Sequence, residues 1–101
     1  MITYEVSARV ESAHVERYET YMKEKHLRDV LASGCFVDAT LERAGPGEFR
    51  TRYRAQTQAD VDRYLRDHTA ALRRDFAEHF PVGVQLAREI WVEVMWIRRR
   101  A

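Results

Sequence analysis

Hydrophobic and polar residues alternate strictly at the start of the chain. The apolar positions are Ile2, Tyr4, Val6, Ala8 and Val10, with polar residues between them. A period of two is typical of a β-strand with one buried face, so we predict a strand over residues 2–10. Similar segments predict strands over residues 35–44, 47–56 and 85–97. The Gly-Pro-Gly sequence at 45–47 predicts a hairpin turn between the second and third strands.

Apolar residues recur at helical spacing after the first strand. The stripe consists of Val15, Tyr18, Met22, His26, Leu27, Val30 and Leu31. Residues three or four positions apart share one face of a helix, so this segment is predicted to be helical. Ser12 suits the N-cap, because its hydroxyl can accept a hydrogen bond from the first turn. Gly34 suits the end of the helix, since glycine enters the left-handed region without steric cost.

A second helix is predicted after the third strand. Thr57 and Asp60 resemble a capping box in which aspartate replaces the usual glutamate. The apolar stripe that follows contains Val61, Tyr64, Leu65, His68 and Leu72. The helix, or a kinked continuation of it, extends to Phe80, and Pro81 ends it.

The predicted order of elements is β-α-β-β-α-β, which is the order of the ferredoxin-like fold. Right-handed crossovers place both helices on one face of a four-stranded antiparallel sheet. The first and third strands are then central, the fourth lies beside the first and the second beside the third. We therefore expect an α+β protein whose residues 1–101 form one ferredoxin-like domain.

The two faces of this sheet differ in polarity. The helix-covered face is expected to carry Tyr4, Val6, Ala8, Val37, Ala39, Leu41, Tyr53, Ile90, Val92 and Val94. The open face is expected to carry Glu5, Arg9, Asp38, Glu42, Arg50, Arg52, Arg54, Glu89 and Glu93. Opposite charges on neighbouring strands stabilise such a face by about 0.2–1 kcal/mol per pair.

Large apolar residues fall among the charges of the open face. The same alternation places Phe36, Trp91 and Met95 there, beside Arg52 and Glu93. Apolar groups surrounded by charges indicate a surface that meets a partner. We predict a homodimer in which two sheets stack through this face, the alternative being a solvated charged surface. A strand slip or bulge in residues 47–56 would reverse part of this assignment.

Composition excludes several classes of partner. The 101 residues include 17 basic and 16 acidic side chains, for a net charge of +1, which gives no general attraction to nucleic acid. The N-terminal segment lacks the unbroken apolar core of a signal peptide, and no apolar run reaches membrane-spanning length. One cysteine permits no intrachain disulfide. A cytoplasmic protein that binds neither nucleic acid nor membrane is expected.

Histidines and tyrosines supply the candidate chemistry. His26 and His68 each fall on an apolar helical stripe that faces the sheet. Together with nearby tyrosines they form the candidate ligand-binding set Tyr4, Tyr18, His26, Tyr53, Tyr64 and His68. An apolar cleft with a few polar groups is the usual form of a small-molecule site. The alternative is that each histidine is structural and bonded to a tyrosine or a backbone carbonyl.

No metal or cofactor site is predicted. His26 and His68 provide two ligands, whereas zinc requires three or four. Cys35 alternates with Val37 and Ala39 and is interpreted as a small core residue rather than a nucleophile. The chain has no glycine-rich phosphate loop and no serine in a nucleophile motif.

The whole pattern resembles the bacterial domain-of-unknown-function family numbered 4286, within the dimeric α+β barrel group. The resemblance rests on three segments: ITYEVSARV, YMKEKHLRDVLASGCFVDATLER and YRAQTQADVDRYLRDHTAALRRDF. Members similarly show a helix ending in a histidine, an apolar pair, a glycine and an aromatic residue that starts the next strand. Here these are His26, Leu27 with Val30 and Leu31, Gly34 and Phe36. The resemblance implies the fold and a dimer, and no activity.

The wider dimeric α+β barrel group includes cofactor-independent monooxygenases, haem-degrading enzymes and lactone isomerases. The haem-degrading branch relies on an Asn-Trp-His set, and this sequence contains no asparagine. Shared fold alone is a weak guide to activity. The resemblance therefore argues against haem degradation and selects no other reaction.

Three functions remain open from the sequence. The first is a homodimer that binds a small apolar or aromatic molecule in the cleft between helices and sheet. The second is a cofactor-independent monooxygenase- or isomerase-like enzyme, with His26 as general base and Tyr4 or Tyr53 orienting the substrate. The third is an interaction module without a ligand.

Overall fold

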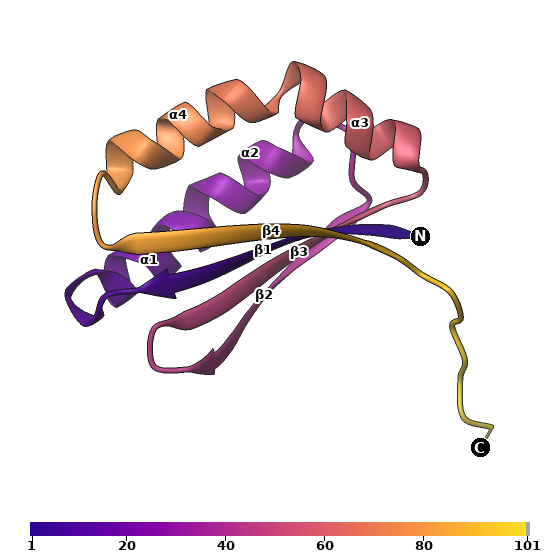
Figure 1. Ribbon diagram of the computed structural model, residues 1–101, viewed down its shortest axis with the longest axis horizontal. Coiled ribbons are helices and arrows are strands. Elements are labelled where there is room, and N and C mark those ends of the chain that lie inside the picture. Colours follow the sequence, from indigo (N-terminus) through magenta and orange to yellow (C-terminus); the bar gives the residue numbers. More distant parts are fainter. Residues whose placement is uncertain (101) are drawn as a thin grey trace.

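The computed structural model describes residues 1–100, and Ala101 lies outside the described residues. The elements are β1 (Ile2–Val10), η1 (Ser12–His14), α1 (Val15–Tyr21), η2 (Met22–His26), α2 (Leu27–Leu31), β2 (Asp38–Gly45), β3 (Glu48–Ala55), α3 (Gln58–Asp67), α4 (Thr69–His79) and β4 (Val84–Val92). Figure 1 shows the helices on one side of the sheet. This is the predicted β-α-β-β-α-β order.

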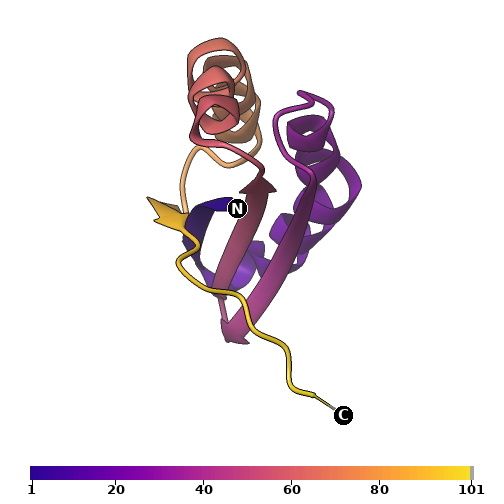
Figure 2. The same cartoon turned by 90° about the vertical axis from the view of Figure 1, so that its right-hand side faces the viewer.

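The sheet has the order β2-β3-β1-β4, and every neighbouring pair is antiparallel. Seen from one end, the run α1–η2–α2 and the pair α3–α4 form two helical columns above the same face (Figure 2). The central position of β1 and β3 and the flanking position of β2 and β4 agree with the prediction. The α+β ferredoxin-like fold is thus confirmed.

The core lies between the sheet and the helices in two clusters of buried residues. The first consists of Tyr4, Val30, Cys35, Phe36, Tyr53, Ala55, Val61 and Tyr64. The second consists of Ala8, Val10, Tyr18, Tyr21, Met22, Phe49 and Phe80. Both clusters use the apolar positions of β1 and β3, because alternation sends these side chains to the helix-covered face.

The second strand begins later than its sequence pattern predicts. β2 starts at Asp38, and the first ladder bond of this segment runs from the Val37 amide to the Arg54 carbonyl at 2.8 Å. Residues 35 and 36 precede the ladder, so the alternation of the strand does not fix their direction. Phe36 is only 7% exposed, so its predicted place on the open face is wrong. Val37 is 51% exposed, so it is not buried beneath the helices as expected.

Phe36 instead packs inside the first core cluster. Its ring lies 4.9 Å from Tyr64 and 5.4 Å from Tyr53, measured between ring centroids. The left-handed conformation of Gly34, with φ of 75°, turns the chain from α2 back towards the sheet and precedes this insertion. Phe36 is therefore a core residue and is not available for an interface on the open face.

The fourth strand ends earlier than its sequence pattern predicts. Val92 pairs with Ile2, and the Glu93 amide bonds to the Met1 carbonyl at 3.0 Å. The β1–β4 register ends at this point. The residues that follow leave the sheet and lie on the side away from the helices (Figure 1). Val94 is 95% exposed there, so its predicted place on the helix-covered face is wrong.

The first helical run contains an irregular turn. Ser12 does not act as an N-cap, because η1 begins at Ser12 itself and no side chain caps it. The segment η2 is a π-helical turn, in which the Leu27 amide bonds to the Met22 carbonyl five residues earlier. Met22 and Leu27 are both apolar and stand five residues apart. In a regular α-helix, residues at this spacing would point in different directions. The wider turn keeps both residues directed at the core.

The second helical run follows the kinked form of the prediction. Thr57 caps α3, and its hydroxyl accepts a hydrogen bond from the Asp60 amide at 3.2 Å. The helix breaks at His68 and resumes as α4. None of the helices in residues 1–100 combines the length and the apolar character needed to cross a bilayer.

Candidate functional site

A cavity of about 260 Å³ lies between the helices and the sheet. Five of the six predicted ligand-binding residues line it: Tyr4, Tyr18, His26, Tyr53 and Tyr64. The sixth, His68, lies at the break between α3 and α4, where its ring stacks on Tyr64 at 6.3 Å. The structure therefore brings together most of the set that the sequence proposed.

Aromatic rings form much of the cavity wall. Tyr4 and Tyr53 stand side by side on the sheet with ring centroids 6.2 Å apart. Phe76 of α4 and Phe80, which directly follows that helix, approach Tyr18 with ring centroids 6.2 and 5.8 Å away. Rings in these stacked and edge-on arrangements offer flat apolar surfaces to a bound molecule.

The buried hydroxyls of Tyr18, Tyr53 and Tyr64 remain protonated at neutral pH. Burial raises the pKa of Tyr53 and of Tyr64 well above the usual value of 10. Burial also raises the pKa of Tyr18 to about 12, an effect that the nearby Thr51 hydroxyl reduces. A protonated hydroxyl donates and accepts hydrogen bonds, so these residues can orient a ligand and cannot serve as a base.

His26 reaches the cavity because of the π-helical turn. The turn brings His26 over Tyr21 five residues earlier, with ring centroids 5.6 Å apart and planes inclined by 29°. π-Helical turns are rare and often occur at functional sites. The ring of His26 also contacts the edge of Phe76 at 5.8 Å.

A carboxylate on α4 supports His26 through Tyr21. The Tyr21 hydroxyl donates a hydrogen bond to Oδ2 of Asp75 at 2.7 Å, and the same hydroxyl lies 3.4 Å from Nδ1 of His26. Because the hydroxyl proton is used by Asp75, the tyrosine oxygen is left as an acceptor. This favours the neutral tautomer with a proton on Nδ1, in which Nε2 is an acceptor.

Burial lowers the pKa of His26 from 6.5 to about 4. Asp29 and Asp75 act in the opposite direction, and the positive charges of Lys25 and Arg88 add to the lowering. The imidazole is therefore neutral at pH 7. It can accept a hydrogen bond from a ligand, and it is a weak base until a bound anion raises its pKa.

Sequence reasoning missed four residues of this site. Tyr21 and Asp75 hold His26, and Arg73 and Arg88 line the cavity. Arg88 could have been predicted from the alternation of β4, because that alternation places it on a face whose other residues are apolar. Tyr21 gave no comparable signal, because five residues separate it from His26 and a regular helix would direct the two differently.

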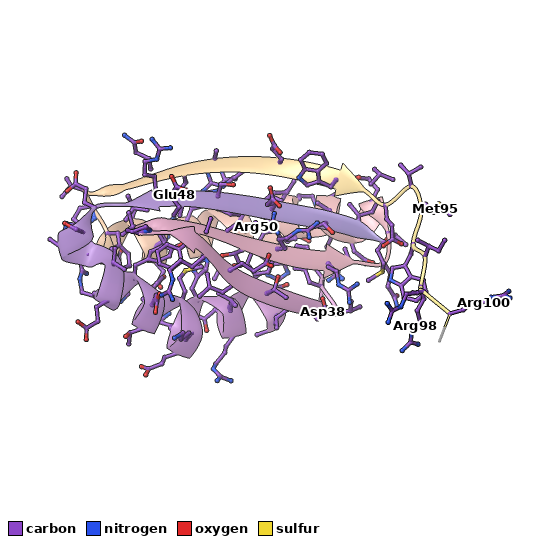
Figure 3. All side chains as sticks on the ribbon, turned by 90° about the horizontal axis from the view of Figure 1, so that it is seen from below. Asp38, Glu48, Arg50, Met95, Arg98 and Arg100 are labelled. Carbon is purple, nitrogen blue, oxygen red and sulfur yellow. The ribbon has the colours of Figure 1, made fainter. Side chains whose placement is uncertain are left out.

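The open face carries the predicted ladder of charges (Figure 3). Nε of Arg50 bonds to Glu42 at 2.8 Å, and Nε of Arg54 bonds to Asp38 at 2.7 Å. Between them, Nε of Arg52 lies 3.3 Å from a carboxylate oxygen of Glu5. All three arginines of β3 therefore have acidic neighbours on an adjacent strand.

A larger hollow of about 730 Å³ lies at the hairpin end of this face. Its charged residues all have ionic partners: Arg50 pairs with Glu42, Arg9 with Glu48 at 3.9 Å, and Arg43 with Glu19 outside the hollow. Most of the charge that a ligand would need is thus already compensated. The cavity on the helix-covered side differs in this respect and is the stronger candidate.

The remaining interface candidates lie at the other end of the open face. Trp91 stands beside Thr3 in the β1–β4 register and is 51% exposed. Met95 is 73% exposed, and a carboxylate oxygen of Glu93 lies 3.9 Å from the amino group of Met1. Figure 3 labels Met95 on the segment that leaves the sheet.

No group of three metal-binding side chains occurs among residues 1–100. Cys35 is 3% exposed within the first core cluster. Its surroundings are those of a small core residue rather than of an accessible nucleophile.

Comparison with solved structures shows the same fold in proteins of low sequence identity. HapK from Hahella chejuensis aligns with a TM-score of 0.74 and 14% identity over 100% of both chains. SnoaB, a cofactor-independent oxygenase from Streptomyces nogalater, aligns with a TM-score of 0.71 and 13% identity over 97% of both chains. A dimeric ferredoxin-like protein from an uncultured marine organism aligns with a TM-score of 0.70 and 6% identity, over 98% of this chain and 100% of the other.

Sequence comparison identifies the family. No curated protein matches the chain. The model of a domain of unknown function, DUF4286, matches residues 1–94, which include every strand and helix described above. The family that the sequence resembles is therefore confirmed, and the chain belongs to the DUF4286 family.

Proposed function

We propose that the protein is a homodimer that binds a small apolar or aromatic molecule in the cavity between the helices and the sheet. The observation that carries this proposal is the cavity itself, with its wall of tyrosine and phenylalanine rings and a neutral histidine. Small-molecule sites are mostly apolar and contain a few polar groups that fix orientation. Here Tyr4, Tyr53 and His26 supply those groups.

The size of the cavity limits the ligand. A volume of about 260 Å³ is slightly below the usual range for drug-sized molecules, roughly 300–1,000 Å³. One or two fused rings are the expected scale of the ligand. A flat molecule would lie against the rings of Tyr4 and Tyr53 on the sheet.

Calorimetric titration with 2-naphthamide, a neutral bicyclic probe, tests the binding proposal. Ala77 lines the cavity from α4, so Ala77→Trp should fill part of the space and weaken binding at least tenfold. The control is Ala71→Trp, which lies on the opposite side of the same helix and should bind like the parent. Absence of binding to the parent protein, or equal binding by both variants, would overturn the proposal.

The dimer part of the proposal rests on the open face. Its charges are largely paired within one sheet, while Trp91 and Met95 expose apolar surface beside them. A second copy of the sheet would cover these residues without leaving most of the charges unpaired. Light scattering at micromolar concentration should give twice the mass of the chain, and a monomer would contradict the proposal.

A cofactor-independent oxygenase- or isomerase-like enzyme is the second candidate. The observation in its favour is the support of His26 by Tyr21 and Asp75, which leaves Nε2 as an acceptor. In this function His26 takes a proton from an acidic substrate, and Tyr4 or Tyr53 orients that substrate. The fold of SnoaB is compatible with such chemistry and does not by itself assign it.

The enzyme candidate is tested by oxygen uptake or double-bond isomerisation with a panel of phenols and enols. His26→Ala should abolish turnover while the fold and the dimer remain intact. A His26 with only a structural role would lower the free energy of unfolding, and turnover would then persist in the folded fraction.

A further inference from the structure

Two arginines interrupt the apolar stripes that face the cavity. Along β4, Val84, Leu86 and Arg88 line the cavity, and the next positions in the same register, Ile90 and Val92, lie outside it and are 43% and 62% exposed. Along α4, the cavity-lining positions are Thr69, Leu72, Arg73, Phe76, Ala77 and Phe80. Arg88 and Arg73 are thus the single charged member of each stripe. Both residues are exposed to solvent, so each charged group stays hydrated while its side chain lines the cavity.

Neither arginine has an acidic partner among residues 1–100. Among the described residues, the arginines that form ion pairs are Arg9, Arg43, Arg50, Arg52, Arg54, Arg63 and Arg66. No aspartate or glutamate lines the cavity, and its histidine is neutral at pH 7. The cavity therefore carries two uncompensated positive charges next to an aromatic wall.

The two guanidinium groups act on the same part of the cavity. Both reduce the rise in the pKa of Tyr64 that burial causes, and Arg88 also contributes to the lowered pKa of His26. Arg73 and Arg88 come from α4 and β4, and both residues are exposed to solvent. They lie at the mouth, whereas Tyr18, Tyr53 and Tyr64 are buried at the wall.

We propose that the cavity binds an aromatic carboxylic acid, whose ring lies against the tyrosines and whose carboxylate is held at the mouth by Arg73 and Arg88. This inference rests on the proposed function and specifies its ligand class. Guanidinium groups bind carboxylates through charge-assisted and often paired hydrogen bonds. The neutral Nε2 of His26 remains an acceptor for a hydroxyl or N–H elsewhere on the same ring.

The test compares 2-naphthoate with its neutral isostere 2-naphthamide by calorimetric titration. The parent protein should bind the naphthoate at least tenfold more tightly, and this advantage should shrink as salt is added. Arg73→Gln and Arg88→Gln should each weaken naphthoate binding about tenfold, which corresponds to the loss of one charged hydrogen bond. Naphthamide binding should weaken much less, because its uncharged carbonyl forms weaker hydrogen bonds with a guanidinium group. Arg74→Gln, next to Arg73 on the outer side of α4, is the matched control and should bind both probes like the parent.

Arg88→Leu gives a second and independent readout. It restores the apolar alternation of β4, so the midpoint of thermal unfolding should stay equal or rise while the preference for naphthoate disappears. An arginine kept for structural reasons would instead lower the midpoint. This opposite sign distinguishes a ligand-binding role from a packing role.

The outcomes separate this inference from the proposed function. If naphthamide binds and Ala77→Trp blocks it, but the arginine variants leave naphthoate binding unchanged, the cavity is a ligand site and the carboxylate inference is wrong. If neither probe binds, both proposals are wrong. If the preference for naphthoate is lost in the Arg73 and Arg88 variants alone, both are supported.

Discussion

The two faces of the sheet use arginine in different ways. On the open face, Arg50 and Arg54 bond to acids on β2, and Arg52 lies beside Glu5 on β1. On the helix-covered face, Arg88 projects among apolar neighbours and has no acidic partner in the described residues. The first arrangement is complete within one chain. The second leaves charge that a molecule from outside can neutralise.

This difference suggests that the two faces bind different kinds of partner. Paired charges can be covered by a second sheet at small electrostatic cost, so the open face suits a protein partner. Unpaired charges beside an aromatic cavity attract a small anion. One strand, β4, contributes to both sides, through Trp91 on the open face and Arg88 on the other.

The largest expected effect comes from Phe36, which was expected on the open face and lies on the other. Phe36→Ala removes a ring that packs on Tyr53 and Tyr64, so the free energy of unfolding should fall by about 3–5 kcal/mol. Urea denaturation followed by circular dichroism measures it. The adjacent residue Val37 is 51% exposed, and Val37→Ala should change the value by no more than about 0.5 kcal/mol. Equal effects of the two substitutions would contradict the assignment of faces.

As the pH is lowered, the free energy of unfolding should first fall because His26, on the helix-covered side, becomes protonated. The carboxylates of the open face should be protonated only at lower pH. The pKa of His26 is about 4 in the folded chain and 6.5 when unfolded, so the unfolded chain binds more protons between these values. Stability should therefore fall as the pH is lowered from about 6.5 to about 4, by up to ~3 kcal/mol.

Urea denaturation over this pH range measures the loss, and His26→Gln should flatten it. Asp38, Glu42 and Asp75 have lowered pKa values in the folded state, because hydrogen bonds stabilise their charged forms. Their contribution is lost only at lower pH and should remain in His26→Gln. A parent curve that is already flat between pH 6.5 and 4 would contradict the burial of His26.

Association should depend on the open face alone. Trp91→Glu places a charge at an exposed apolar position and should weaken dimerisation by about 2 kcal/mol, the scale of an interface hot spot. Sedimentation over a range of protein concentrations measures the change. Val82 is 70% exposed in the loop before β4, and Val82→Glu is the control that should leave assembly unchanged. If Trp91→Glu assembles like the parent, the proposed interface on the open face is wrong.

The smallest expected effect concerns the charge ladder. Asp38→Asn removes the partner of Arg54 and should lower the free energy of unfolding by about 0.2–1 kcal/mol. Glu89 lies opposite Glu5 in the register, so Glu89→Gln should be neutral or slightly stabilising. Both differences should vanish in about 1 M salt, where exposed charges are screened. A salt-independent loss in Asp38→Asn would mean that the residue acts through packing.

Periodicity predicted the strands, the helices and most of the cavity wall. Residues such as Tyr4, Tyr53 and Tyr64 lie well inside regular elements, and their direction follows from alternation or from helical spacing. The kink at His68 and the Thr57 cap were also within reach, because their signals are local.

The features that the sequence did not predict depend on where regular structure stops. Phe36 precedes the first ladder bond of β2, and Val94 follows the last pair of the β1–β4 register. The π-helical turn depends on the packing of the segments before and after it. No single residue in the sequence therefore predicts it. Asp75 joins the site only because α4 lies against η2, a contact between segments distant in sequence.

Cys35 provides a built-in reporter of motion at the cavity. It is the only thiol of the chain, and it is buried in the same cluster as Tyr4, Tyr53 and Tyr64. A thiol reagent can modify it only when this part of the molecule opens, so the labelling rate measures the free energy of that opening under native conditions. A bound ligand should slow the labelling in proportion to its occupancy. The unmodified protein thus carries its own single-site assay for ligands of the cavity.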